Sequence, residues 1–241
     1  MELRRYSCNR TSLLLMCFSE IPTCAIGSVC FDVDSTVCVD EGIDELARFM
    51  GVENNVEHIT SRAMNGELDF TEALNTRMAI INPRKADLDR FIAANPPRIT
   101  TGFREVIDRL QFNGINVFLV SGGFDPIVQK VAECVGICMD NVYSNRILFA
   151  EDGSYLGLDP DQPTYYAHGK ADVVAEIKQR CNKDVIIVGD GMTDARACPP
   201  AALFIGFGAN VDRPAVRKAT PYFCKTVSEL ISLFETLGLI K

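Results

Sequence analysis

The sequence has no excess of basic residues and no long apolar run. Against 24 Lys and Arg stand 32 Asp and Glu, which gives a net charge of −8. Broad nucleic-acid binding needs a basic surface, so we do not expect nucleic acid as a partner. No stretch approaches the roughly 18 apolar residues of a membrane span. A small anionic substrate stays compatible with this charge, because a few cations and a metal can reverse the sign within one cleft.

Histidine is scarce, and the cysteines lack the spacing of a metal site. The chain has 2 His and 10 Cys, and no pair of cysteines is separated by only two residues. This argues against a zinc site. Because Cys30 lies in an apolar run with Val29 and Phe31, we interpret the cysteines as small buried residues of a reduced intracellular protein.

The first 25 residues differ from the rest of the chain. Arg4, Arg5 and a short apolar run at 13–18 are weak signs of a targeting peptide, but no clear cleavage site follows. We therefore expect residues 1–25 to be a poorly ordered extension of a cytoplasmic enzyme. Import into an organelle is the alternative.

Strand and helix signals alternate along most of the chain, which predicts an α/β fold. Continuous apolar runs indicate buried parallel strands, and amphipathic stretches between them indicate helices. Such β-α-β alternation is typical of a doubly wound parallel sheet with right-handed crossovers. The predicted strands are 27–34, 115–120, 184–188 and 203–206, and the predicted helices between and after them begin near 102, 125, 170 and 226.

A helical block interrupts this alternation directly after the first strand. Four helices are predicted, at 42–50, 53–65, 69–80 and 84–93, and Pro96-Pro97 ends the block. We expect residues 41–96 to form a small helical cap domain, and residues 26–40 with 97–241 to form the α/β core. Within that core, Asp152-Gly153 between alternating apolar residues predicts a hairpin over 147–158.

Polar residues follow three of the predicted strands. Asp32 and Asp34 end the first, Ser121-Gly122-Gly123 follows the second, and Asp190 and Asp194 follow a later one. Parallel strands bind ligands at their carboxyl ends, so we expect these residues to meet. Four aspartates at one edge tolerate each other only with a cation among them. Oxygen ligands without His or Cys favour Mg²⁺.

Each motif has an ordinary structural explanation when it is taken alone. An aspartate often ends a strand as a turn residue, Ser-Gly-Gly and Gly-Asp-Gly are usually plain turns, and a lysine on a helix is usually solvated. Their order along the chain, with Lys170 between the second and third groups, favours a common function instead.

The set of motifs resembles that of the haloacid dehalogenase superfamily of phosphotransferases. The residues that carry the resemblance are Asp32-Val33-Asp34-Ser35-Thr36, Ser121-Gly122-Gly123, Lys170 and Gly189-Asp190-Gly191-Met192-Thr193-Asp194. A finer similarity, to the animal-type phosphoserine phosphatases, lies in Glu41 to Leu46, Ala63-Met64, Leu119 to Phe124, Asn145-Arg146 and Phe204 to Gly208. The resemblance covers about residues 28–238.

The resemblance implies a Mg²⁺-dependent hydrolysis of O-phospho-L-serine to L-serine and phosphate, the last step of serine biosynthesis. By the resemblance, Asp32 attacks phosphorus and becomes an aspartyl phosphate, and Asp34 acts as general acid and then general base. Ser121 and Lys170 complete the implied catalytic set. The implied Mg²⁺ ligands are Asp32, the backbone carbonyl of Asp34, Asp190 and Asp194.

The resemblance also implies how the amino-acid end is read. Glu41 would bind the ammonium group and Arg77 the carboxylate, to which a guanidinium is well matched. Without the family match, Glu41 would be a charge at a helix N-terminus and Arg77 a solvated helix residue. The other implied substrate-binding residues are Met64, Phe70, Ser121, Gly122, Gly123, Asn145, Lys170, Thr193 and Arg213.

Two alternatives stay open at this stage. One is a related superfamily phosphatase or phosphotransferase for another small phosphomonoester, and the other is a binding protein on an inactive phosphatase core. The second is disfavoured because no catalytic position is replaced. The expected partner is a small-molecule substrate, O-phosphoserine; the sequence does not determine the oligomeric state, for which a homodimer is one option.

Overall fold

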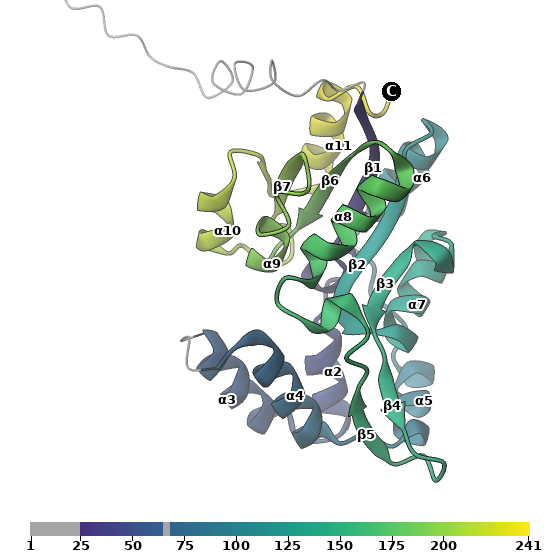
Figure 1. The fold of residues 1–241 in the computed structure, drawn as a ribbon, viewed down its shortest axis with the longest axis vertical. Coiled ribbons are helices and arrows are strands. Elements are labelled where there is room, and N and C mark those ends of the chain that lie inside the picture. Colours follow the sequence, from purple (N-terminus) through teal and green to yellow (C-terminus); the bar gives the residue numbers. More distant parts are fainter. Residues whose placement is uncertain (1–24, 65–67) are drawn as a thin grey trace, which may run out of the picture.

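A parallel sheet of six strands, in the order β3-β2-β1-β6-β7-β8, forms the centre of the molecule (Figure 1). The computed structural model describes residues 25–64 and 68–241, without the side chains of Ala63 and Met64. Every pairing in this sheet is parallel, so the predicted fold class is confirmed. The strands are β1 (Ile26–Phe31), β2 (Asn116–Phe124), β3 (Val142–Asn145), β6 (Asp184–Gly189), β7 (Leu203–Phe207) and β8 (Phe223–Cys224).

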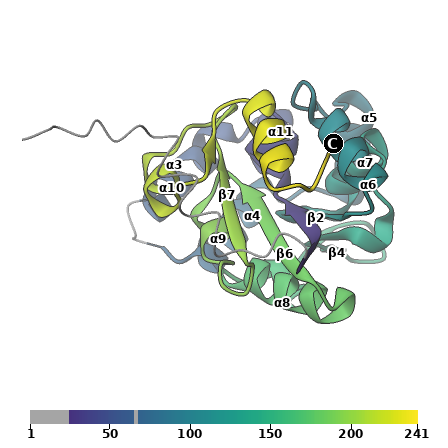
Figure 2. The same ribbon diagram turned by 90° about the horizontal axis from the view of Figure 1, so that it is seen from above.

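Helices cover both faces of the sheet (Figure 2). One face packs against α6 (Phe103–Phe112), α7 (Asp125–Val135) and α11 (Val227–Thr236). The other face packs against α8 (Gly169–Cys181), α9 (Met192–Ala195) and α10 (Pro214–Ala219). All six residues of β1 are buried, which is why its sequence, apolar except for Ser28, does not alternate between apolar and polar residues.

Four further helices lie at one end of the sheet, in the lower part of Figure 1. They are α2 (Gly42–Phe49), α3 (Glu53–Met64), α4 (Phe70–Ile81) and α5 (Lys85–Ala94). Their apolar side chains form a third hydrophobic cluster, around Leu46, Met78 and Phe91.

The predicted hairpin is present and packs against these helices. It comprises β4 (Ile147–Phe149) and β5 (Tyr155–Leu158), which pair antiparallel. Ile147 and Leu158 are buried in the same cluster as the four helices. At the hairpin turn, the Lys85 amide donates to the Gly153 carbonyl at 2.9 Å. Two short 3₁₀ helices, η4 (Met139–Asn141) and η5 (Pro163–Tyr165), flank the region of the hairpin.

Two predicted strand ends were wrong by a few residues. The first strand ends at Phe31 rather than at 34, because Asp34 accepts a hydrogen bond from the Gly42 amide and Ser35 has a φ of 54°. The second strand continues to Phe124 and therefore contains the Ser-Gly-Gly sequence. Helix α7 begins at Asp125, as predicted, and the Asp125 carboxylate accepts from the Ser144 hydroxyl at 2.6 Å.

Candidate active site

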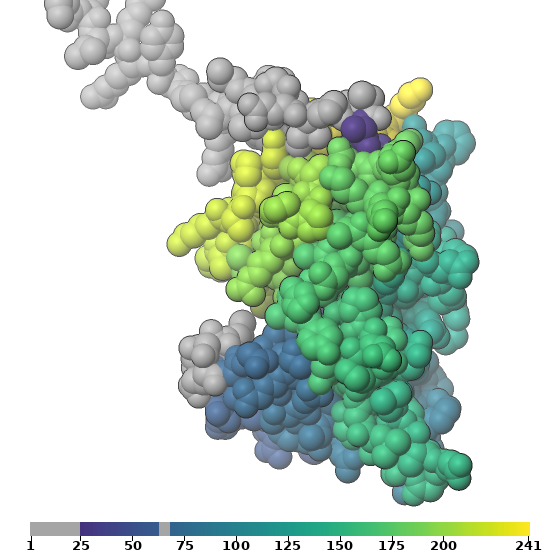
Figure 3. All heavy atoms as spheres, in the orientation of Figure 1, coloured from purple at the N-terminus to yellow at the C-terminus, as the bar shows by residue number. Residues whose placement is uncertain are grey.

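The carboxyl ends of β1, β2 and β6 bring the predicted motifs together. The three strands are neighbours in the sheet, so the residues that follow them share one edge. Figure 3 shows an indentation of the surface at this level, between helices α3 and α4 and the side of the core that carries α9 and α10. Asp32, Ser121, Lys170, Asp190 and Asp194 are all buried there.

Lys170 joins two of the aspartates. Its Nζ lies 2.7 Å from Asp32 Oδ1 and 2.7 Å from Asp194 Oδ1, and both carboxylates are buried. Burial alone would lower the pKa of Lys170, but Asp194 and Asp32 raise it above its usual value. Lys170 therefore stays charged, and its ammonium marks the position where a further anion, such as a phosphate, would be attracted.

Arg213 forms a second bridge, between Asp190 and Glu41. Its Nε donates to Asp190 Oδ2 at 2.8 Å, and its Nη2 lies 3.3 Å from Glu41 Oε1. Glu41 also accepts from the Ser35 hydroxyl at 2.8 Å. Burial raises the pKa of Glu41, and the nearby Asp32 adds to the shift. The bridge thus connects the aspartate cluster to the start of α2.

The aspartates carry more negative charge than these two cations neutralise. Burial, with Glu41 and Asp32 nearby, raises the pKa of Asp34 to about 8. Burial and Asp32 likewise raise the pKa of Asp190 to about 6 and that of Asp194 to about 7. One oxygen each of Asp32, Asp190 and Asp194 lies within 4.8 Å of the others. An all-oxygen cluster with excess negative charge fits a hard divalent cation.

The Ser-Gly-Gly segment lies directly against Asp34. The Ser121 hydroxyl is 3.4 Å from Asp34 Oδ2 and accepts from the Gly123 amide at 2.8 Å. A Cβ on Gly123 would lie 3.0 Å from both Asp34 Oδ2 and Ser121 Oγ, so only glycine fits without a shift. Gly122 is open on its outer side, where a Cβ would meet nothing closer than Phe70 Cζ at 3.7 Å. Ser121 and Asp34, which were both predicted to be catalytic, are therefore brought together at the end of β2.

Helix α4 contributes residues that lie near the Ser121–Gly123 segment. Phe70 begins this helix and reaches toward Gly122. Arg77 is partly buried: burial lowers its pKa, while its electrostatic interactions with Asp44, Glu41 and Asp34 oppose that shift. The side chain of Arg77 is thus partly shielded from solvent, and its Nε donates to the Ala73 carbonyl at 3.3 Å. The side chain of Met64, also predicted to bind substrate, lies outside the described residues.

Asn145 is fully buried and has both ends of its amide engaged by the protein. Its Nδ2 donates to the Gly122 carbonyl at 2.8 Å, and its Oδ1 accepts from the Thr164 hydroxyl at 3.0 Å. Thr193 is partly buried in α9, one residue before Asp194.

Sequence reasoning missed the contribution of η5 and Gly169. A Cβ on Gly169 would lie 1.8 Å from the Pro163 carbonyl oxygen, so Gly169 is required for the approach that sets the start of α8 and with it Lys170. Pro163 and Gly169 in the sequence hint at a turn, but no periodic pattern announces their contact.

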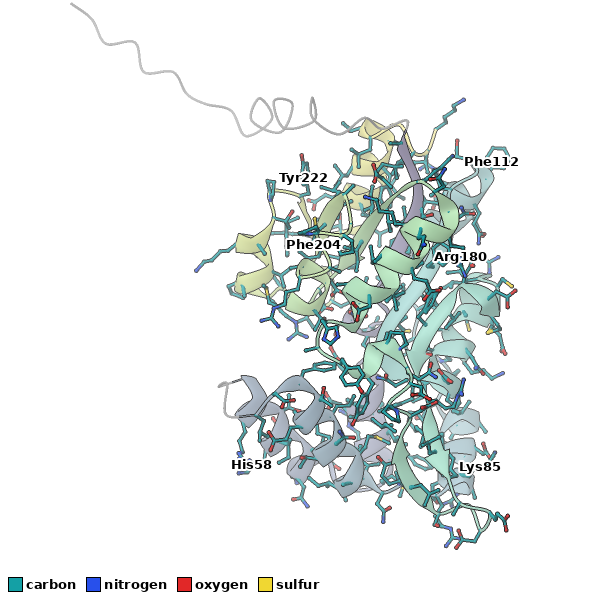
Figure 4. All side chains as sticks on the ribbon, in the orientation of Figure 1. His58, Lys85, Phe112, Arg180, Phe204 and Tyr222 are labelled. Carbon is teal, nitrogen blue, oxygen red and sulfur yellow. The ribbon has the colours of Figure 1, made fainter. Side chains whose placement is uncertain are left out.

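The two histidines are exposed, and the cysteines that the structure describes differ in exposure. His58 is exposed on α3, and Figure 4 shows it at the outer side of that helix. His168 is exposed and interacts with Asp172 at 3.2 Å. Cys30, Cys38 and Cys224 are buried, as interpreted, whereas Cys134 and Cys138 are exposed, which corrects that interpretation. No disulfide joins the cysteines that the structure describes.

Comparison with known proteins agrees with this geometry. The family model of the haloacid dehalogenase-like hydrolases matches residues 29–198. The phosphoserine phosphatase of Rattus norvegicus is 46% identical over 88% of this chain and 95% of its own length. This chain belongs to the phosphoserine phosphatase family of the haloacid dehalogenase-like hydrolases.

Further members of the family extend the likeness to the three-dimensional structure. The phosphoserine phosphatase of Homo sapiens is 46% identical over 86% of this chain and 93% of its own length. A solved structure described as a substrate-bound phosphoserine phosphatase complex is 28% identical, with a TM-score of 0.74 over 90% of this chain and 99% of its own. Among the described residues, no helix has the length and apolar character needed to cross a membrane.

Proposed function

We propose that the protein hydrolyses O-phospho-L-serine to L-serine and phosphate, by way of an aspartyl phosphate on Asp32. The observation that carries this proposal is the contact of Lys170 Nζ with Asp32 Oδ1 at 2.7 Å, near the Ser121–Gly123 segment at the end of β2. In this pair, Asp32 would supply the attacking carboxylate, and the buried ammonium of Lys170 would supply a cation that binds an anion. Membership of the phosphoserine phosphatase family supports the choice of substrate.

In the first half of the reaction, a carboxylate oxygen of Asp32 forms a bond to phosphorus and the bond from phosphorus to the serine oxygen breaks. Lys170, the Ser121 hydroxyl and the open Gly122 side of the loop would bind the phosphoryl oxygens. Asp34 is held near Ser121 and Gly42, and it would give its proton to the leaving serine oxygen.

In the second half, water attacks phosphorus and the bond from phosphorus to Asp32 breaks, which releases phosphate. Asp34, deprotonated by the first half, would take the proton of this water, so the carboxyl returns to its starting state. We propose that Asp32, the Asp34 carbonyl, Asp190 and Asp194 are the ligands of Mg²⁺. Dependence on a metal ion is typical of the family. When bound, Mg²⁺ offsets the repulsion between Asp32 and the phosphate.

The amino-acid end of the substrate would be held from the cap side. We propose that Arg77 binds the carboxylate and Glu41 the ammonium group, with Phe70 and Met64 closing the site. Thr193, Gly123, Asn145 and Arg213 would complete the substrate surroundings. The electrostatic attraction of Arg77 to Glu41 and Asp34, which opposes the lowering of its pKa by burial, supports this placement.

We propose that residues 41–96 form a cap domain on a core of 26–40 and 97–241. We also propose that the protein is cytoplasmic, and a homodimer is the assembly to test. The plant relative from Arabidopsis thaliana is named as chloroplastic. Residues 1–24, on which organelle import would depend, lie outside the described residues. Microscopy of the full chain with a C-terminal fluorescent tag tests the location.

A substrate panel tests the proposed function. Phosphate release would be measured with O-phospho-L-serine, O-phospho-D-serine, phosphoethanolamine and 3-phosphoglycerate, each with Mg²⁺. We expect O-phosphoserine to have the highest kcat/KM. A higher value for phosphoethanolamine or 3-phosphoglycerate, each of which lacks one charged group of the amino-acid end, would instead favour the alternative, a superfamily phosphatase for another small phosphomonoester.

A further inference from the structure

The short helix η5 lies where three parts of the site meet. It follows the hairpin and precedes α8, which carries Lys170. On one side, the buried Thr164 hydroxyl donates to Asn145 Oδ1 at 3.0 Å. Asn145 in turn donates to the carbonyl of Gly122 at 2.8 Å. Two hydrogen bonds therefore connect η5 to the Ser121–Gly123 segment, which is proposed to bind phosphate.

A second side of η5 supports Lys170. The Gly169 amide donates to the Tyr166 carbonyl at 3.0 Å, just beyond the end of η5. The α carbon of Gly169 approaches η5 so closely that an added Cβ would lie 1.8 Å from the Pro163 oxygen. The first turn of α8 thus rests on η5, and the position of Lys170 depends on it.

The third side of η5 contacts helix α4. Asn75 Nδ2 donates to the hydroxyl of Tyr165 at 2.6 Å, and the Thr71 hydroxyl donates to the Tyr165 carbonyl at 3.3 Å. Thr71 and Asn75 are four residues apart, so they present their polar groups on one face of the helix. The ring of Tyr165 packs against the third hydrophobic cluster. The same helix carries Phe70 and Arg77.

We propose that Tyr165 is a positioning residue that fastens α4 to η5 and thereby sets Arg77 at a fixed distance from the phosphate-binding loop. The chain enters and leaves the helical block near residues 40 and 97, so lateral contacts must fix its orientation over the site. Tyr165 supplies one that combines a hydroxyl, a carbonyl and an apolar ring. The assignment of phosphoserine as the affected substrate rests on the proposed function.

The test compares variants that remove one bond of this contact. Tyr165→Phe keeps the ring and loses the hydroxyl, Asn75→Ala removes its donor, and the double variant removes both. Tyr166→Phe is the matched control, because this exposed neighbour keeps its ring contacts with Tyr165 and His168. The KM and kcat for O-phosphoserine, the inhibition constant of inorganic phosphate and the Tm are measured for each.

We expect each single variant to raise the KM for O-phosphoserine about two- to tenfold, the equivalent of one net hydrogen bond. The kcat should change less than twofold, because the core residues that react are untouched. The inhibition constant of phosphate should stay the same, since Lys170, Ser121 and Gly122, which are proposed to bind phosphate, lie outside α4. The double variant should be no worse than the more impaired single one. Tyr166→Phe should behave as the unaltered protein.

Three outcomes would overturn the proposal. Additive losses in the double variant would show that Tyr165 and Asn75 act separately. If phosphate binding weakened as much as the KM for O-phosphoserine rose, the effect would lie in the core. If the Tm fell while the KM stayed unchanged, Tyr165 would have only a structural role. Hydrogen exchange of the α4 amides is the readout that does not depend on substrate. The exchange should become faster in Tyr165→Phe even if the protein proves inactive on O-phosphoserine. Inactivity would therefore reject the proposed function, and unchanged exchange would reject the positioning role of Tyr165.

Discussion

Lys170 and Asp32 form a buried ion pair in which Nζ lies 2.7 Å from Oδ1. The same ammonium contacts Asp194 at 2.7 Å, so its removal would leave two buried carboxylates without their cation. Breaking a buried pair from one side typically costs about 3–5 kcal/mol of stability. The pair therefore holds the nucleophile in place and, by the proposed mechanism, also attracts the phosphate.

Replacing Lys170 should impair both roles. We expect Lys170→Met to lower kcat by about 10²–10³, the loss typical of one removed transition-state donor, and to lower the Tm. Lys178→Met is the control, because that lysine forms an exposed ion pair with Asp184 at 2.8 Å. Steady-state kinetics and thermal unfolding measure the two effects. A kcat within tenfold of the unaltered value would remove Lys170 from the catalytic set.

The nucleophile can be tested without changing its shape. Asp32→Asn removes the attacking charge, so we expect turnover to fall by several orders of magnitude while circular dichroism stays unchanged. Asp34→Asn should also be severely impaired, through loss of the proton relay. General acid–base catalysis contributes a rate factor of roughly 10²–10⁴. Activity of Asp32→Asn above about one hundredth of the unaltered activity would correspond to the weak end of that range and would contradict the covalent mechanism. Beryllium fluoride should bind the unaltered protein and not Asp32→Asn.

The sequence predicted that Asp32, Ser121 and Asp190 would meet, because each lies at the carboxyl end of an apolar run and parallel strands share one edge. Arg213 was expected at the site only from the resemblance to the family. Its contacts with Asp190 and Glu41 could not be predicted, because Arg213 precedes a short helix, α10, whose pattern does not link it to those distant residues.

The same limit applied to the fold. The long central strands were found because they are buried on both faces, whereas β8 has only two residues and no detectable period. The hairpin was predicted from Asp152-Gly153, but its packing against α5 was not, because nothing local indicates which surface will cover Ile147.

Gly169 offers a test of backbone packing near the site. Gly169→Ala would place a methyl group 1.8 Å from a backbone oxygen of η5, which cannot turn aside as a flexible side chain would. We expect a lower Tm and at least a tenfold loss of kcat, because the start of α8 moves together with Lys170. Ala171→Gly, two residues on, is the control for a change of helix propensity of about 1 kcal/mol. An unaltered kcat in Gly169→Ala would show that Lys170 does not depend on this contact.

Removal of metal should abolish activity. With excess EDTA we expect no phosphate release, and Mg²⁺ should restore it, because the clustered carboxylates need a divalent cation. Ca²⁺ should inhibit, since it prefers more ligands at longer distances. Mg²⁺ should also raise the stability of the protein, by about 2.7 kcal/mol at a hundredfold excess over its Kd. Asp190→Asn should weaken this effect in thermal unfolding. Full activity in chelator, or restoration by zinc alone, would contradict the assignment.

The identity of the substrate can be read from paired changes in ligand and protein. Phosphoethanolamine lacks the carboxylate proposed for Arg77, and 3-phosphoglycerate replaces the ammonium proposed for Glu41 by a hydroxyl. A charge-assisted contact contributes about 1.5–3 kcal/mol, or roughly ten- to a hundredfold in kcat/KM at about 1.4 kcal/mol per decade. Both compounds should therefore be poor substrates beside O-phosphoserine.

The variants should then separate the two contacts. Arg77→Ala should lower kcat/KM strongly for O-phosphoserine and change phosphoethanolamine hydrolysis little, because that substrate does not use the guanidinium. Glu41→Gln should impair O-phosphoserine more than 3-phosphoglycerate. Since Glu41 also contacts Arg213 and Ser35, Ser35→Ala serves as its control, and it should affect all substrates alike. Equal losses on all three substrates for Arg77→Ala and Glu41→Gln would mean that both residues support the fold or the position of the cap, and that specificity for an amino acid arises elsewhere.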